Sequence, residues 1–378
     1  MNFKTILAKN YVNFRGWSTK RKIVVIESDD WGSIRTPSKE VYDNLLSKGI
    51  PMDKSYFTKY DSLETQEDLQ QLFAVLRSYT DKNGRNPCIT ANALVANPDF
   101  DTIKKNNFES YHYERIEKTY QRYYGNTNVF DTWINEGIKE RLLYPQFHGR
   151  EHIGVWEWMS ALRSGEVQEL SGFESKAILG LGNRKSATRQ KDYTAAFDYI
   201  SDEEKYSLLP ILEDGLNLFE ETYGFRSKSF AAPSAIRGSF MDEFLFKHGV
   251  LYHQLGQQYQ PDGKGKLEII NKFWGDRNEQ GQLYWRRNAT FEPSRSPNFD
   301  WIESCLEEMA IAFRWGKPAV INSHRVNFMG TLSEENRANS LSLLSGLLTA
   351  MLQKWPDVEF MSSDELGDYM AFTIQSKK

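Results

Sequence analysis

Two adjacent aspartates, Asp29 and Asp30, follow a hydrophobic run that begins at Ile23, in the segment Glu27-Ser-Asp-Asp-Trp-Gly32. Two carboxylates this close repel each other unless a cation or a proton separates them. A bend at the end of a strand can bring both side chains into one cleft, with a metal ion on one and proton transfer on the other. The alternative is an ordinary turn or helix cap, because aspartate is common in both.

The segment His148-Gly-Arg-Glu-His152 follows a short predicted strand at 144–147. Two histidines four residues apart lie on one face of a helical turn and can chelate one metal ion. The chain has only six histidines, so this pairing favours a metal site over two unrelated surface histidines. The order of residues differs from the His-Glu-x-x-His pattern of zinc proteases, which excludes that class.

Two further segments also follow predicted strands. In Phe230-Ala-Ala-Pro-Ser234, a proline-containing turn can aim a backbone N–H group near Ser234 into a site as an oxyanion donor, although an ordinary turn is the alternative. In Ile321-Asn-Ser-His-Arg325, His324 ends a buried strand. A histidine in that position is either structural or part of a site.

Together these residues form a coherent ligand set. Asp30, His148 and His152 supply one oxygen and two nitrogen ligands, and three protein ligands with one open position are typical of catalytic zinc and similar metals. We therefore expect one divalent metal ion, zinc in the first place, with cobalt, manganese or nickel as alternatives. Asp29 then remains as the general base and His324 as the general acid.

The elements that position these residues alternate between strands and helices. Strands are predicted at 22–27, 87–95, 144–147, 229–232, 249–252, 318–322 and 358–361, and the longer helices at 66–79, 201–224 and 333–352. The motifs come where strands end, which is where barrel enzymes place their active sites. The predicted fold class is α/β: a single irregular (β/α) barrel over residues 1–378, with an insertion at 99–135.

The order of the motifs resembles the polysaccharide deacetylase family, also called the NodB-homology group. That family has a Thr-Phe-Asp-Asp-Gly motif, matched by Asp29 and Asp30, and a His-(Ser/Thr)-x-x-His motif, matched by His148 and His152. Its Leu-x-x-His motif is matched by Ile321 to His324. The resemblance implies a barrel of the glycoside hydrolase/deacetylase type and a hydrolase that removes acetyl groups from N-acetylated, or O-acetylated, sugars or polysaccharide precursors.

Several positions depart from the family motifs, which makes this chain a divergent member. Trp31 stands where the family has glycine, and Gly149 replaces serine or threonine. Ala231 takes the place of the arginine that orients the aspartate base in the family. Arg35 and Arg237 are the candidates to replace that arginine from elsewhere in the chain.

Three residues, Trp31, Trp156 and Ser234, are assigned to the oxyanion and substrate side of the site. Flat aromatic rings such as Trp156 stack on sugar rings, although packing in the core is an equal alternative. The tyrosines of the 99–135 insertion could also contact sugars, with a purely packing role as the alternative.

The composition is that of an ordinary soluble protein. Charged residues make up 26% and the net charge is −4, so neither nucleic acid nor an anionic membrane is expected as a partner. The two cysteines, Cys88 and Cys305, exclude a disulfide scaffold and a thiolate zinc site. With no signal-peptide core and no apolar run of about 18–20 residues, a cytoplasmic location is expected. The partner is a carbohydrate substrate, and the sequence leaves the oligomeric state open.

Two other functions stay open. The same site could hydrolyse an ester, another carbon–nitrogen bond or a glycosidic bond, although a glycosidase needs two carboxylates around the bond and no metal. The chain could instead be a non-catalytic carbohydrate-binding protein on a degenerate barrel, which the alanine at position 231 would support. Asp29 and His324 argue against this second alternative, because binding alone needs neither of them.

Overall fold

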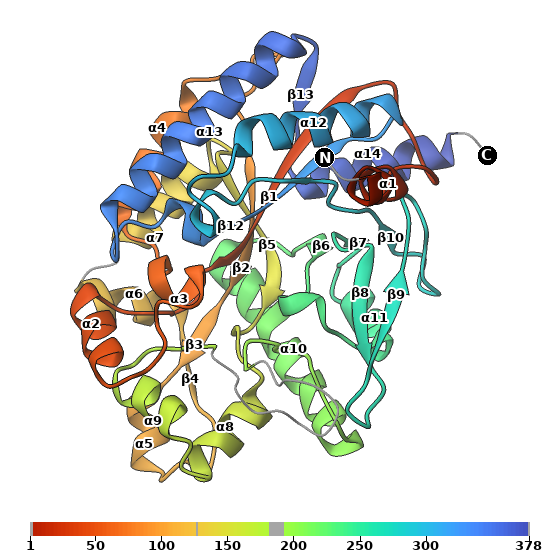
Figure 1. Ribbon diagram of the computed structural model, residues 1–378. Helices are drawn as coiled ribbons and strands as arrows, with labels where there is room; N and C mark the ends of the chain where they lie inside the picture. The colour runs from red at the N-terminus through yellow and green to blue at the C-terminus, as the bar shows by residue number, and fades with distance from the viewer. Residues whose placement is uncertain (1–2, 126–127, 181–192, 377–378) are drawn as a thin grey trace.

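The computed structural model describes residues 3–125, 128–180 and 193–376. Its centre is a sheet in which every neighbouring pair of strands is parallel, in the order β10-β7-β6-β5-β2-β1-β12-β11, with β13 paired to the start of β1 (Figure 1). The strands are β1 (Lys22–Trp31), β2 (Ile89–Leu94), β5 (Leu143–Gly149), β6 (Ser229–Phe230), β7 (Tyr252–His253), β10 (Leu283–Tyr284), β11 (Ala289–Thr290), β12 (Ala319–His324) and β13 (Val358–Phe360). This curled parallel sheet with surrounding helices confirms the predicted (β/α) barrel.

Helices follow most of the strands and surround the sheet (Figure 1). The α-helices outside the segment between β2 and β5 are α1 (Phe3–Tyr11), α2 (Lys39–Ser47), α3 (Tyr56–Tyr60), α4 (Gln66–Arg77), α8 (Val155–Arg163), α9 (Val167–Glu174), α10 (Asp202–Tyr223), α11 (Asp242–Lys247), α12 (Trp301–Arg314), α13 (Glu334–Lys354) and α14 (Ser363–Gln375). Single 3₁₀ turns lie at Pro233–Ala235, Ser239–Met241, Pro293–Arg295 and Arg325–Phe328. An antiparallel hairpin, β8 (Gln257–Pro261) and β9 (Leu267–Asn271), stands beside the barrel. None of the helices in the described ranges is both long and apolar enough to cross a bilayer.

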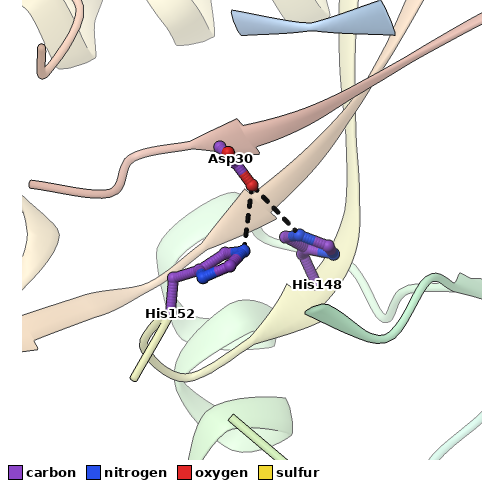
Figure 2. A group of neighbouring side chains, drawn as sticks. All are labelled: Asp30, His148 and His152. Atoms are coloured by element: carbon purple, nitrogen blue, oxygen red, sulfur yellow. Dashed lines mark ion pairs between the residues drawn. The ribbon is translucent and has the colours of Figure 1, made fainter. Parts of the chain in front are cut away.

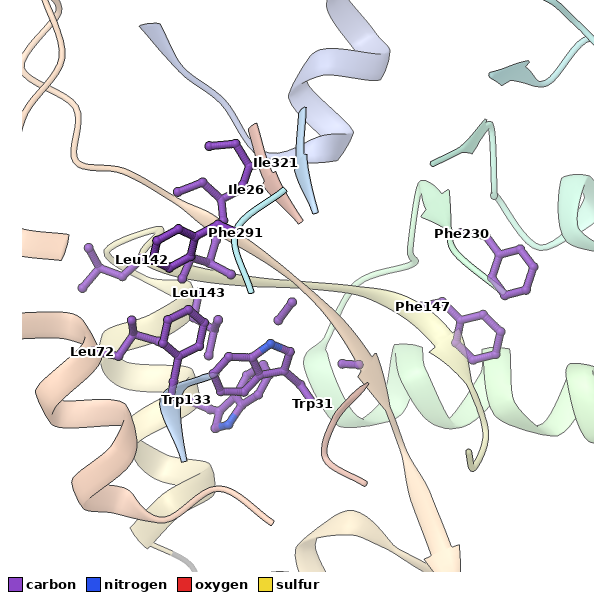
Figure 3. Packing of buried hydrophobic residues seen from close by; sticks show 14 of the residues in the cluster. Ile26, Trp31, Leu72, Trp133, Leu142, Leu143, Phe147, Phe230, Phe291 and Ile321 are labelled. Atoms are coloured by element: carbon purple, nitrogen blue, oxygen red, sulfur yellow. The ribbon is translucent and has the colours of Figure 1, made fainter. Parts of the chain in front are cut away.

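Strand β1 is buried on both of its faces, as its run of four β-branched residues predicts. Val24 and Ile26 belong to the largest hydrophobic cluster, whereas Ile23 and Val25 point the other way into a second cluster. At the end of the strand, Trp31 is fully buried in the larger cluster and packs edge-on against Trp133 (Figure 3). The strand that carries the two aspartates is therefore rigidly embedded.

The segment between β2 and β5, which contains the predicted insertion 99–135, holds several short elements. They are β3 (Ala96–Pro98), α5 (Phe100–Lys105), β4 (Tyr113–Arg115), α6 (Ile116–Tyr124), α7 (Asn128–Thr132) and a turn of π-helix at Trp133–Ile138. Its tyrosines are used for packing: the Tyr120 hydroxyl donates to Glu64, and the Tyr123 hydroxyl donates to the carbonyl of Lys176. These contacts favour the packing role over sugar binding for this segment.

Candidate metal centre and active site

The end of β1 turns both aspartates toward one side of the sheet. Asp29 lies opposite His324 in the parallel register of β1 with β12. In a regular strand the next side chain would point to the other face. Asp30 instead has a φ of 76°, and the register of β1 with β2 shifts between Ser28 and Trp31. This bulge re-aims the Asp30 side chain, and such strained positions are typical of functional sites.

The two histidines come from the end of β5 and from the loop that follows it. In the register of β5 with β2, Phe147 and Gly149 are paired while His148 is left between them, and Gly149 has a φ of 146°. His152 lies in a bend before α8. The expectation that both histidines share a helical turn is therefore wrong, because the backbone irregularity at Gly149 folds the chain back without a helix. Their ring centroids are 5.3 Å apart.

Asp30, His148 and His152 form a buried group whose possible ligand atoms all lie within 4.8 Å of one another (Figure 2). The Asp30 Oδ1 atom lies 3.5 Å from His148 Nε2 and 3.0 Å from His152 Nε2. These three side chains are the ones that the sequence assigned to a metal.

The hydrogen bonding and burial of the two imidazoles suit metal ligands. His148 Nδ1 is 2.7 Å from the carbonyl oxygen of Ala231, to which it donates, so Nε2 is the nitrogen left to bind a metal. That Nε2 atom is buried and has no hydrogen-bond partner in the described part of the chain. Burial lowers the pKa of His152, which keeps its ring neutral. One carboxylate and two imidazoles, with an orphaned buried nitrogen, fit a divalent transition metal.

Asp29 is not one of the three grouped side chains and is held instead by Arg287. The Arg287 Nη1 and Nη2 atoms donate to the two carboxylate oxygens of Asp29 at 2.7 Å each, and Arg287 Nε donates to Glu27 at 2.6 Å. Burial alone would raise the pKa of Asp29, but the charge and hydrogen bonds of Arg287 outweigh it and hold that pKa below its ordinary value. Asp29 is therefore an oriented, ionised carboxylate.

Sequence reasoning missed Arg287. The two candidates it named lie elsewhere: Arg237 pairs with Asp242, and Arg35 lies 3.3 Å from Asp30 instead of Asp29. Arg287 comes just before β11, a strand of only two residues that no periodicity could reveal. The signal that could have found it is the pair Arg286-Arg287 in an otherwise weakly charged stretch, but nothing in that pair indicates Asp29 as the partner.

His324 is held by Glu292, a residue that the sequence analysis did not indicate. Its Nδ1 donates to Glu292 at 2.5 Å, and its Nε2 lies 3.9 Å from Asp29 Oδ2. Burial alone lowers the pKa of His324, but the Glu292 carboxylate outweighs this and raises it to about 9. The edge of Phe57 packs against the imidazole at a centroid distance of 5.1 Å. His324 is therefore protonated at neutral pH and fixed in place.

One cavity of about 640 Å³ is lined by the grouped side chains and by the residues around Asp29: Asp29, Asp30, His148, His152, Arg287 and His324. Ser234 also lines it and has a left-handed φ of 53°. The two tryptophans assigned to the substrate side do not line it. Trp31 is in the core, because the bulge that turns Asp30 outward leaves the next side chain facing inward. Trp156 is 42% exposed and lines a separate pocket of about 140 Å³.

A buried ionic network lies next to α3, whose residue Phe57 lines this cavity. Arg325, fully buried, donates to both oxygens of Asp61 at 3.1 Å and to Glu64 at 2.8 Å. Asp61 directly follows α3, which carries Phe57, and Arg325 directly follows His324. The network thus ties α3 to the end of β12.

We expect Arg325→Met to destabilise the protein by about 3–5 kcal/mol, because two carboxylates would stay buried without their cation. Denaturant unfolding measures the change. The control is Arg226→Met, which removes an exposed ion pair with Glu220 and should cost less than about 0.5 kcal/mol. Equal, small effects of the two substitutions would show that the network does not stabilise the fold.

Comparisons with known proteins place this chain beside several solved structures. No family model and no curated protein matches it. One similar structure is described as a polysaccharide deacetylase from Mycobacterium smegmatis (12% identity, 95% of this chain and 93% of that chain, TM-score 0.44). Another is described as a glycoside hydrolase/deacetylase from Parabacteroides distasonis (11%, 93% and 72%, 0.45), and a third as an allantoinase (11%, 93% and 91%, 0.41). They include the family that the sequence motifs resemble, and the functional assignment below rests on the geometry of the site.

Proposed function

We propose that this protein is a metal-dependent hydrolase that removes acetyl groups from N-acetylated sugars or polysaccharide precursors. One observation carries the proposal: Asp30 lies with two histidines, while the adjacent Asp29 is held by Arg287 and faces His324. A metal site, an ionised base and a protonated acid thus share one cavity, which is the set that hydrolysis of an amide requires.

Asp30, His148 and His152 would hold the metal, for which the nitrogen-rich donor set favours zinc. When bound there, a divalent ion would lower the pKa of water and would stabilise the negative charge that develops on the acetamide oxygen. The Ser234 backbone N–H is the candidate for a second oxyanion donor, since Ser234 lines the same cavity.

The remaining steps belong to the chain's own side chains. Asp29 accepts a proton from the attacking water, and Arg287 keeps its carboxylate turned toward the cavity. His324 gives a proton from Nε2 to the leaving amine nitrogen, while its Nδ1 stays bonded to Glu292. The 3.9 Å between His324 Nε2 and Asp29 Oδ2 supports an acid and a base that act on the same reacting group.

The contact of Arg287 with Asp29 supports a catalytic role over a binding-only role. The binding-only alternative drew on the alanine at position 231, and Arg287 now supplies the missing cation. A protein that only binds sugar gains nothing from burying a charged base and its arginine, because burial of charges costs free energy.

An acetate-release screen tests the proposal. The purified, zinc-loaded protein is incubated with N-acetylated sugars, O-acetylated sugars and the same sugars without acetyl groups. We expect acetate only from acetylated compounds, with the N-acetylated ones turned over fastest. Acetate from the O-acetylated compounds alone would make the enzyme an esterase. Sugar fragments without acetate would indicate a glycosidase, and no product from any compound would contradict the hydrolase assignment.

The pH dependence tests the role of Glu292. If His324 must be protonated, activity should persist up to about pH 9 and fall as the pH rises through the pKa of His324. Glu292→Gln removes the negative charge that raises this pKa, so the alkaline limb should move to lower pH by about 1–3 pH units. The measurement is a profile of kcat against pH. An unmoved alkaline limb in the variant would show that His324 is not the titrating acid.

A further inference from the structure

Arg35 lies on the wall of the metal cavity and is only 7% exposed. Its Nη2 atom donates to the Oδ2 oxygen of Asp30 at 3.3 Å. Its Nε atom is buried without a hydrogen bond, 3.5 Å from Asp61. The residues described offer no hydrogen-bond partner to Nη1. Arg35 is thus a buried cation with donors left over beside the site.

The other arginine of the cavity has no such capacity. Arg287 uses all three of its nitrogen atoms on Glu27, Asp29 and neighbouring amide oxygens. The two carboxylates next to Arg35, those of Asp30 and Asp61, also contact other residues. Both oxygens of Asp61 accept from Arg325, and the Oδ1 atom of Asp30 faces the two histidines. Arg35 pairs with Asp30 and Asp61 and lies over the ring of Phe57, and of the two cavity arginines it is the one with N–H donors left unused.

The space next to Arg35 is kept open by a glycine. Gly180 also lines the cavity, and a Cβ atom built on it would lie 3.3 Å from Arg35 Nη1. Gly180 has a φ of 61°, which glycine adopts more easily than other residues. A side chain there would crowd the unused Nη1 donors of Arg35, which lines the cavity.

We propose that Arg35 binds an anionic group of the substrate, a carboxylate or a phosphate, and that the site therefore takes acidic acetamido sugars. The proposal rests on the proposed function and narrows its substrate class. The planar fork of arginine suits both anions, and a charge-assisted hydrogen bond is stronger than a neutral one. The acetamide would lie at the metal, with the acidic group a few bonds away against Arg35.

The test compares N-acetylglucosamine with four acidic derivatives: its uronic acid, its 3-O-lactyl ether, its 1-phosphate and its 6-phosphate. Binding to the zinc-loaded protein is measured by calorimetry, and acetate release is followed in parallel. We expect at least one acidic sugar to bind about 10- to 100-fold more tightly than the neutral one. The preferred derivative shows whether the anion is a carboxylate or a phosphate. Equal affinities, or no binding of any of the five, would overturn the proposal.

Three variants locate the preference at Arg35. Arg35→Gln should abolish it, Arg35→Lys should retain part of it, and Gly180→Ala, which changes no charge, should reduce it. The exposed Arg226→Gln is the control and should keep it in full. A preference that survives in both Arg35→Gln and Gly180→Ala contradicts the assignment, and Gly180→Ala decides alone if Arg35→Gln fails to fold.

The parallel acetate assay separates this inference from the proposed function. Arg35-dependent binding of an acidic sugar without acetate release would uphold the anion site and contradict the deacetylase reaction. Equal acetate release from the neutral and acidic sugars, with equal affinities, would uphold the reaction and contradict the anion site.

Discussion

Replacing Asp29 by asparagine is expected to lower kcat by about 10²–10⁴-fold while the bound metal stays in place. Asparagine keeps the shape of the side chain but cannot accept a proton from water. Asp29 is not one of the three grouped ligand side chains, so metal content should match that of the unmodified protein. The measurements are acetate release under saturating substrate and metal content by mass spectrometry.

Two further variants sharpen this prediction. His324→Gln should cause a loss of similar size, and the double variant should be scarcely slower than either single one, because residues that act as a unit are not additive. Asp357→Asn, at an exposed carboxylate paired with Lys22, is the matched control and should be fully active. Full activity of Asp29→Asn on a verified substrate would show that the base is another group.

The largest effect on metal binding is expected from the three grouped side chains. Each of Asp30→Ala, His148→Ala and His152→Ala should weaken metal affinity by more than about 100-fold, since even the loss of an outer hydrogen-bonding partner costs about 10–100-fold. All three should also lose activity. Affinity is measured by competition with a chelator of known affinity, which needs no turnover.

The matched control for these variants is His112→Ala, because His112 is an exposed histidine outside the cavity. It should bind metal as tightly as the unmodified protein does. The assignment of the metal site would be wrong if the three ligand variants and the His112 variant all bound metal equally well.

The grouping of Asp30 with His148 and His152 could be predicted because its signal is local in the chain. Asp30 follows an apolar strand, and His148 and His152 stand four apart after another. The spacing of these residues could not predict the backbone conformation that brings them together. The left-handed φ of Asp30 and the irregularity at Gly149 depend on how β1 and β5 pair with β2. For this reason the predicted helical turn between the two histidines was wrong. For the same reason Trp31, predicted on the substrate side, lies in the core.

The contacts of Arg287 with Asp29 and of Glu292 with His324 could not be predicted in the same way. Arg287 reaches Asp29 across 258 positions, and Glu292 reaches His324 across 32. Both flank β11, which is too short for any periodic pattern. Apolar residues revealed β1, β2 and β12, and β6 was predicted at 229–232, whereas the two-residue strands β10 and β11 gave no separate signal. Contacts of this kind follow from the closure of the barrel and not from spacing in the sequence.

Reversible removal of the metal tests the central claim most directly. The protein is treated with a chelator, freed of it, and assayed for acetate release from an N-acetylated sugar before and after one equivalent of zinc is restored. We predict that activity disappears with the metal and returns with it, whereas His148→Ala protein does not recover. Undiminished acetate release by metal-free protein would contradict the account.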